Sequence, residues 1–133
     1  MLITEYFNKI EANIAACPNV VESQLTKDIR SLHIGIVEGM LTFTDESVLY
    51  FIEFVNVKGA PHSYKYSYHY QDKDLNLIFR YDMAPHHKEI PSYPHHKHTS
   101  PDVVIASSAP DVAIVLERKY VSDTDCPDER IRA

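Results

Sequence analysis

The most restrictive feature of the sequence is a row of tyrosines at every second position. Tyr64, Tyr66, Tyr68 and Tyr70 alternate with polar residues, among them His69. Successive side chains of a β-strand point to opposite faces of a sheet, so this period predicts a strand with an aromatic side and a polar side. An aromatic side of this kind most often packs in a core. The polar side is then left for solvent or for a site.

A second alternating segment, residues 75–82, follows a turn at residues 72–74 and is expected to be the return strand of a hairpin. The positions on its apolar side are Leu77, Phe79 and Tyr81. Any register that pairs these positions with the tyrosine row also brings the two polar sides together. The sequence therefore predicts that His69 lies opposite or diagonal to Arg80, with Gln71 and Asp82 nearby.

The rest of the pattern alternates between helix and strand signals. Residues 2–16 have the apolar period of an amphipathic helix, which Pro18 ends. Further strands are expected at residues 19–26, 33–44 and 48–57, with a short last strand at 103–106. Ser107 or Ser108 is expected to cap a final helix that buries Val112, Val115 and Leu116.

We therefore expect a single α+β domain over residues 1–121. A curved antiparallel sheet of about five strands is expected to lie between an N-terminal and a C-terminal helix. Residues 122–133 are expected to form a polar tail. Glu38 and Glu53 interrupt apolar strands, and both are expected to face solvent as the alternate positions of half-buried strands.

Histidine is concentrated in and after the hairpin. Six of the eight histidines fall between residues 64 and 98, and they are His69, His86, His87, His95, His96 and His98. Pro91, Pro94 and Pro101 predict an irregular loop after the hairpin, because proline lacks an N–H and has a fixed φ. If this part of the chain were extended, His96 and His98 would share a face.

Composition limits the partners and the location of the chain. The net charge of −6 argues against a general nucleic-acid binder, although residues 58–98 are locally basic. No apolar run is long enough to cross a membrane and no signal pattern opens the chain, so a cytoplasmic location is expected. Cys17 and Cys126 lie far apart in sequence and are expected to be reduced thiols.

The mixture of histidine, arginine and tyrosine with few carboxylates suits acid–base chemistry on RNA. Attack of a 2′-hydroxyl on the adjacent phosphate needs a base, an acid and a cation, and no metal is required. Histidine can fill either proton-transfer role near neutral pH, and Arg80 can hold a phosphate with two parallel hydrogen bonds.

The same cluster has an alternative interpretation, in which the protein is a non-catalytic module. The histidine-rich loop would then hold zinc or another divalent metal, or a protein partner. Zinc sites usually combine histidine with cysteine or carboxylates, and the only carboxylates offered here are those of Asp82 and Glu89.

Two segments, YSYHYQDKDLNLIFRYDMAPHH and PSYPHHKH, resemble the TumE family, the toxins of two-gene toxin–antitoxin modules. The similarity is nearly continuous from Tyr66 to His98. Leu75 stands where glycine is common in the family, in the turn of the hairpin. Met83 stands where the family pattern has asparagine.

The resemblance implies a growth-inhibiting toxin that acts on RNA and is neutralised by a cognate helix-turn-helix antitoxin. We expect a ribonuclease without a cofactor, and a fold related by analogy to RelE- or barnase-like ribonucleases. A homodimer is left open. The expected catalytic residues are His69, Arg80, His86, His87, His95 and His96. The expected substrate-binding residues are Tyr68, Gln71, Asp82, Lys97 and His98.

Overall fold

The computed structural model describes residues 1–59, 62–83, 95–100, 103–106 and 115–116. Side chains are described for all of these except residues 62–64, 95–96, 100 and 103–106. One helix and seven strands follow one another in this part of the chain: α1 (Ile3–Ala15), β1 (Val20–Ile29), β2 (Ile34–Phe43), β3 (Val48–Asn56), β4 (His62–Gln71), β5 (Leu77–Met83), β6 (His95–Ser100) and β7 (Val103–Ala106).

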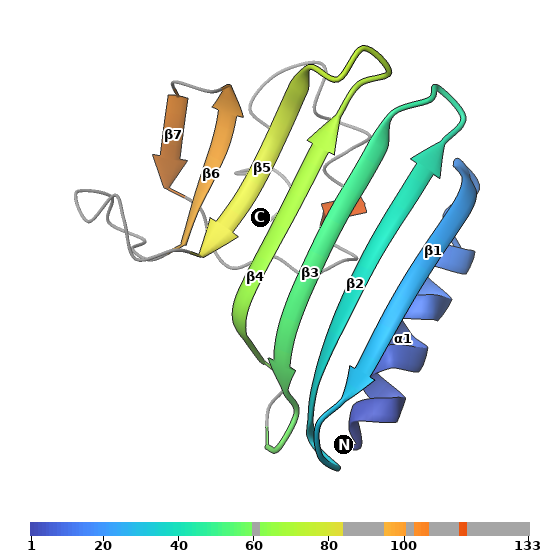
Figure 1. The fold of residues 1–133 in the computed structure, drawn as a ribbon, viewed down its shortest axis with the longest axis vertical. Helices are drawn as coiled ribbons and strands as arrows, with labels where there is room; N and C mark the ends of the chain where they lie inside the picture. The colour runs from blue at the N-terminus through green and yellow to red at the C-terminus, as the bar shows by residue number, and fades with distance from the viewer. Residues whose placement is uncertain (60–61, 84–94, 101–102, 107–114, 117–133) are drawn as a thin grey trace.

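The strands form one antiparallel sheet in the order in which they occur in the chain, from β1 to β7 (Figure 1). The predicted α+β class and antiparallel sheet are confirmed, but the number of about five strands is wrong. The segment expected to be an irregular loop contains β6, which pairs with β5. Pro94 precedes this strand instead of interrupting it, and proline is tolerated at the start of a strand.

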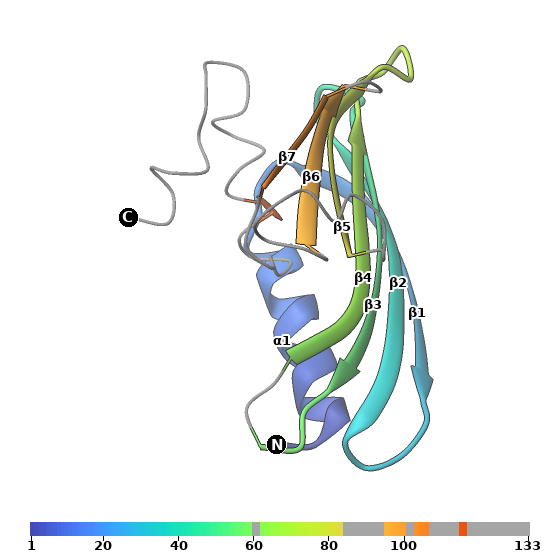
Figure 2. The same ribbon diagram turned by 90° about the vertical axis from the view of Figure 1, so that its left-hand side faces the viewer.

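The sheet has one covered face and one open face. Figure 2 shows α1 packed against one side of the curved sheet, and no described element covers the other side. The tyrosine row points to the covered side, where Tyr66, Tyr68 and Tyr70 are buried with Phe79 and Tyr81. Burial of each large apolar side chain contributes roughly 1.5–3 kcal/mol. This aromatic layer therefore decides which face of β4 and β5 turns inward.

The helix forms where its apolar spacing predicts it. Ile3, Phe7, Ile10 and Ile14 fall on one stripe and are buried in the same core as the aromatic layer. At its start, the carboxylate of Glu5 accepts a hydrogen bond of 2.7 Å from the backbone N–H of Leu2, the residue that caps the helix.

The expected C-terminal helix lies mostly outside the described residues. Only Val115 and Leu116 of it are described, and both are helical and buried in the core. The expected polar tail at residues 122–133 also lies outside the described part. α1 is thus the one helix that the structure describes as an element.

The expectation for Glu53 is wrong, whereas Glu38 is exposed as expected. Glu53 is fully buried on the covered face, where its Oε1 accepts a hydrogen bond of 2.6 Å from the Tyr6 hydroxyl. In β3 the residues on both faces are mostly apolar, so alternation alone does not tell which face carries the carboxylate. The bond joins α1 to the centre of the sheet.

The first prediction concerns this bond between helix and sheet. Tyr6→Phe removes the hydroxyl and leaves a buried carboxylate with one hydrogen bond fewer, so the free energy of unfolding is expected to fall by about 1–3 kcal/mol. Urea unfolding followed by circular dichroism measures the change. Tyr50→Phe, which removes a hydroxyl from an exposed side chain, is the matched control and is expected to leave the stability unchanged. Equal effects of the two variants would contradict the prediction.

The second prediction concerns the β4–β5 turn. Leu75 has a φ of 69° and a side chain that is 74% exposed, so it occupies a backbone conformation that favours glycine and buries little apolar area. Leu75→Gly is therefore expected to raise the free energy of unfolding by about 0.5–1 kcal/mol, after subtraction of the greater freedom of glycine in the unfolded chain.

Lys73→Gly in the same turn is the control for this prediction. Among the described residues other than glycine, only Glu46 and Leu75 have a positive φ, so glycine relieves no strain at position 73. This variant is expected to lower the free energy of unfolding, because glycine gives the unfolded chain more conformational freedom. A stability loss of the same size in Leu75→Gly, measured by the same urea unfolding, would refute the role given to the backbone of Leu75.

Candidate active site

A row of polar side chains crosses the open face of the sheet from strand to strand. The register pairs Tyr50 with His69, His69 with Arg80, and Arg80 with His98. Directly paired residues of antiparallel strands share a face, with Cβ atoms roughly 4.5–5.5 Å apart. The predicted neighbourhood of His69 and Arg80 is thus confirmed. We call His69, Arg80 and His98 the His–Arg–His row.

The guanidinium group of Arg80 is held by Asp82 on the same strand. Nη2 of Arg80 lies 2.7 Å from Oδ2 of Asp82, with the arginine side chain 44% exposed and the carboxylate almost buried at 9%. A charge-assisted contact of this length restricts the rotamers of Arg80 and still leaves part of the guanidinium open to solvent. The arrangement fixes a cation on the open face between two histidines.

The environment of His69 favours its neutral form. Burial lowers the pKa of His69 below its ordinary value, and the positive charge of Arg80 lowers it further, while a hydrogen bond with the side chain of Gln71 acts in the opposite direction. A histidine that is neutral at physiological pH can accept a proton, which is the property of a general base.

The covered side of the same strands keeps this row in register. The ring of Tyr68 stacks on Phe51 at 5.9 Å between centroids, and the Tyr70 hydroxyl donates a hydrogen bond of 2.8 Å to Oγ of Ser47. Phe79 packs against both Tyr70 and Tyr81. A shift of one residue would expose these rings, so the register that presents the row is strongly specified.

Two of the expected substrate-binding residues lie on the covered face instead. Tyr68 is fully buried, and Lys97 is buried with its Nζ 5.3 Å from the ring centroid of Phe79 and 5.0 Å from that of Tyr81. Lys97 is separated from the His–Arg–His row by the thickness of the sheet. A lysine placed over aromatic faces is stabilised by cation–π attraction.

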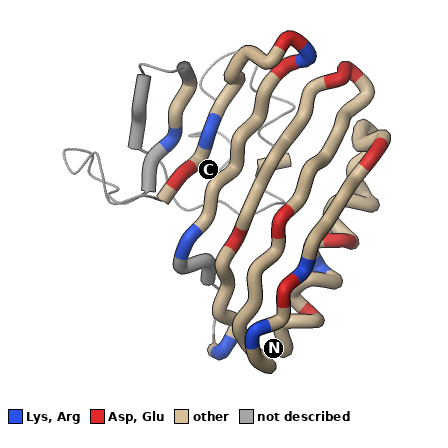
Figure 3. The backbone as a smooth tube through the Cα atoms, in the orientation of Figure 1, with Lys and Arg blue, Asp and Glu red and all other residues tan. Residues whose placement is uncertain are grey.

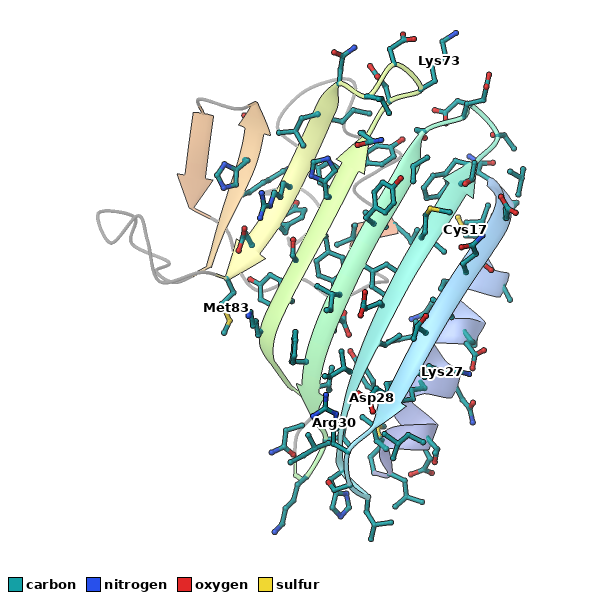
Figure 4. The ribbon with its side chains drawn as sticks, viewed as in Figure 1. Cys17, Lys27, Asp28, Arg30, Lys73 and Met83 are labelled. Carbon is teal, nitrogen blue, oxygen red and sulfur yellow. The ribbon has the colours of Figure 1, made fainter. Side chains whose placement is uncertain are left out.

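Of the other expected residues, the structure places some and leaves others outside its described part. His95 pairs with Met83 and His96 pairs with Asp82, in the strand next to β5. Figure 4 shows Met83 at the end of β5. His86 and His87 lie outside the described residues. The structure therefore brings together His69, Gln71, Arg80, Asp82 and His98.

His98 was expected to bind substrate, but its position beside Arg80 was not predicted. The alternation of His96 and His98 already indicated that both would lie on one face of a strand, but strand β6 itself was not expected. A hollow of about 370 Å³ that adjoins His69 was also missed. Its lining residues come from four strands, β1 to β4, and only the register of the folded sheet places them together.

Charge is distributed unevenly along the sheet. Figure 3 shows that the charged residues of β1 to β3 are mostly acidic, whereas those of β4 to β6 are mostly lysine and arginine. Within this second half, Arg80 and Lys65 belong to the open-face positions of their strands. The sheet therefore offers an anion its most favourable position at β4 and β5, despite the net charge of −6.

The described residues contain no group of three or more histidine, cysteine or acidic side chains that could hold a metal ion. Most of the histidine-rich segment lies outside this statement, since residues 84–94 and the side chains of residues 95–96 are not described. The alternative of a zinc-binding loop stays a prediction. Cys17 is half-buried and forms no disulfide with any described residue.

These features define a small α+β protein with a polar sheet face that presents histidine and arginine. The family model for Toxin TumE matches residues 10–122, so the chain belongs to the TumE toxin family. It is therefore a toxin of a toxin–antitoxin system, with an antitoxin as its partner. No curated protein and no solved structure matches the chain. The likeness to RelE- or barnase-like folds thus stays an analogy. No helix in the described part is long and apolar enough to cross a membrane.

The third prediction concerns the titration of His69. NMR titration of the imidazole is expected to give a pKa below the ordinary value of about 6.5. Arg80→Gln removes a neighbouring positive charge, so the pKa is expected to rise. Lys65→Gln, four residues away on the same strand, is the control and is expected to leave the His69 titration unchanged. A pKa that does not respond to Arg80→Gln would show that the two side chains are electrostatically independent.

Proposed function

We propose that this toxin is a metal-independent endoribonuclease that cleaves RNA by attack of a 2′-hydroxyl on the adjacent phosphate. The observation that carries the proposal is the His–Arg–His row, in which two imidazoles flank one guanidinium on an open face. A base, a phosphate-binding cation and an acid are the three groups that this reaction needs. Family membership as a toxin agrees with an activity that stops growth.

The roles follow from position and charge. His69, kept neutral by burial and by Arg80, accepts the proton of the 2′-hydroxyl. The 2′-oxygen forms a bond to phosphorus while the bond from phosphorus to the 5′-oxygen breaks. A protonated His98 on the far side of Arg80 donates a proton to that leaving oxygen. The products are a 2′,3′-cyclic phosphate and a 5′-hydroxyl end, and no water or metal is consumed.

The spacing of the strands supports this division of roles. β4 and β6 are separated by β5, so the backbones that carry His69 and His98 lie about 9.6 Å apart, at roughly 4.8 Å per strand. That span accommodates one phosphate between two imidazoles that each form a hydrogen bond of about 2.8 Å. Arg80 lies midway and supplies donors for the non-bridging oxygens, which gain charge in the transition state.

Asp82 is better suited to hold Arg80 than to contact RNA. Its carboxylate is almost buried and already bonded to the guanidinium, and a free carboxylate would repel a phosphate. We assign it a positioning role. His86, His87, His95 and His96 remain candidates for a second acid or for further phosphate contacts, and the proposed antitoxin is a helix-turn-helix protein.

The fourth prediction tests the activity directly. Purified toxin is incubated with single-stranded RNA in the presence of EDTA, and the ends of the products are identified. Cleavage with 2′,3′-cyclic phosphate and 5′-hydroxyl ends is expected. His69→Ala and Arg80→Ala are each expected to lower the rate by about 10²-fold or more, because each removes a group that acts in the transition state. Lys27→Ala is the matched control, because Lys27 lies on the helix side of β1, where it pairs with Glu11 of α1.

Circular dichroism and the urea midpoint show whether each variant is folded. Intact RNA under these conditions, together with undiminished growth inhibition by His69→Ala in cells, would overturn the proposal. Cleavage that appears only after addition of zinc would instead favour the metal-binding alternative.

A further inference from the structure

The hollow on the open face has the size and the position of a ligand subsite. Its volume of about 370 Å³ falls within the range of roughly 300–1,000 Å³ that is usual for small-molecule sites. His69 lines it on β4, and the other lining residues include Gln24, Glu38, Met40, Tyr50 and Ser67. The hollow is therefore adjacent to His69, the proposed general base of the reaction.

The hollow contains an exposed ring and an exposed acceptor. Tyr50 is 44% exposed and is the direct partner of His69 in the register. An aromatic side chain in this position provides a face on which a nucleobase can stack. Glu38 pairs with Ile52 and is thus diagonal to Tyr50, within reach of anything stacked on that ring.

The carboxylate of Glu38 provides a chemical basis for distinguishing the four bases. None of the ion pairs found within the described residues involves Glu38, so no described cation competes for its oxygens. An ionised carboxylate only accepts hydrogen bonds. The Watson–Crick edge of guanine presents two adjacent donors, N1–H and N2–H, to such a pair of oxygens. Each of the other three bases presents an acceptor beside its donor, and that acceptor is repelled by the carboxylate.

The order of the groups across the sheet matches the order of the groups in a nucleotide. The hollow lies over β1 to β4, and His69, Arg80 and His98 follow on β4, β5 and β6. In RNA the base is followed by the ribose with its 2′-hydroxyl, then by the phosphate and then by the leaving 5′-oxygen. We propose that the hollow binds a guanine base on the 5′ side of the cleaved bond, so that the toxin cuts after guanosine. This inference rests on the proposed ribonuclease activity.

The fifth prediction measures the base preference separately from cleavage. Isothermal titration calorimetry compares the 3′-monophosphates of guanosine, adenosine, cytidine and uridine, none of which contains a bond that the enzyme can cut. The guanosine nucleotide is expected to bind roughly tenfold more tightly than the others. Glu38→Gln is expected to remove this preference. Tyr50→Ala is expected to weaken all four nucleotides by roughly tenfold, because stacking does not depend on the base.

Glu22→Gln is the matched control, since Glu22 is an exposed carboxylate on β1 that lies outside the lining of the hollow. It is expected to keep the preference for guanosine. In parallel, the cleavage sites on a mixed-sequence RNA are mapped for the wild type and for Glu38→Gln. The wild type is expected to cut after guanosine, and Glu38→Gln is expected to cut without this preference.

The outcomes separate the two proposals. Cleavage without preference for guanosine, in binding and in mapping alike, overturns the guanine subsite and leaves the ribonuclease function standing. Preferential binding of the guanosine nucleotide without cleavage of RNA supports the subsite and overturns the proposed function. Absence of binding by all four nucleotides, or a preference that survives Glu38→Gln, overturns the subsite.

Discussion

The organisation of this toxin depends on one constraint, the burial of alternate aromatic residues on β4 and β5. Tyr66, Tyr68 and Tyr70 can reach the core only if the residues between them point to the other side of the sheet. The same choice on β5 buries Phe79 and Tyr81 and turns Arg80 outward. A polar site is therefore a geometric by-product of core packing. The many ring contacts on the covered face hold the His–Arg–His row more firmly than any interaction within the row itself.

Arg80 shows how the open face combines stability with availability. A fully buried ion pair would carry a large desolvation cost and would not reach a ligand. A pair in which both side chains are at least half exposed, such as Arg30 with Asp28 at 2.8 Å, contributes little and is screened by salt. Between these cases, Arg80 is bonded to an almost buried carboxylate and is itself 44% exposed. The carboxylate of Asp82 is thus protected from water, whereas the guanidinium of Arg80 is not.

Local patterns predicted the parts of the structure that depend on nearest neighbours in sequence. The spacing of Ile3, Phe7, Ile10 and Ile14 was enough for α1. The tyrosine period was enough for the hairpin and for placing His69 next to Arg80, opposite or diagonal to it. Glu53 could not be placed, because β3 is apolar on both faces and its orientation depends on contact with α1. The position of His98 could not be predicted without β6, and the prolines that precede this strand are typical of a loop.

The hollow was beyond prediction for a different reason. Glu38, Tyr50 and His69 come from three strands, and none of them belongs to a local motif with the others. Their proximity is a property of the combined registers of β2, β3 and β4. The family resemblance is nearly continuous only over residues 66–98, and Glu38 and Tyr50 lie before that segment.

The strictly sequential order of the strands has a consequence for the timing of synthesis on the ribosome. Each strand pairs with the one made just before it, so α1 and β1 to β5 can assemble before residue 95 has left the exit tunnel. The second histidine of the row arrives only with β6. A nascent chain at that stage already has most of its sheet but lacks one of its two flanking imidazoles. The cell that makes the toxin is in this way exposed to the complete surface only after β6 has emerged from the ribosome.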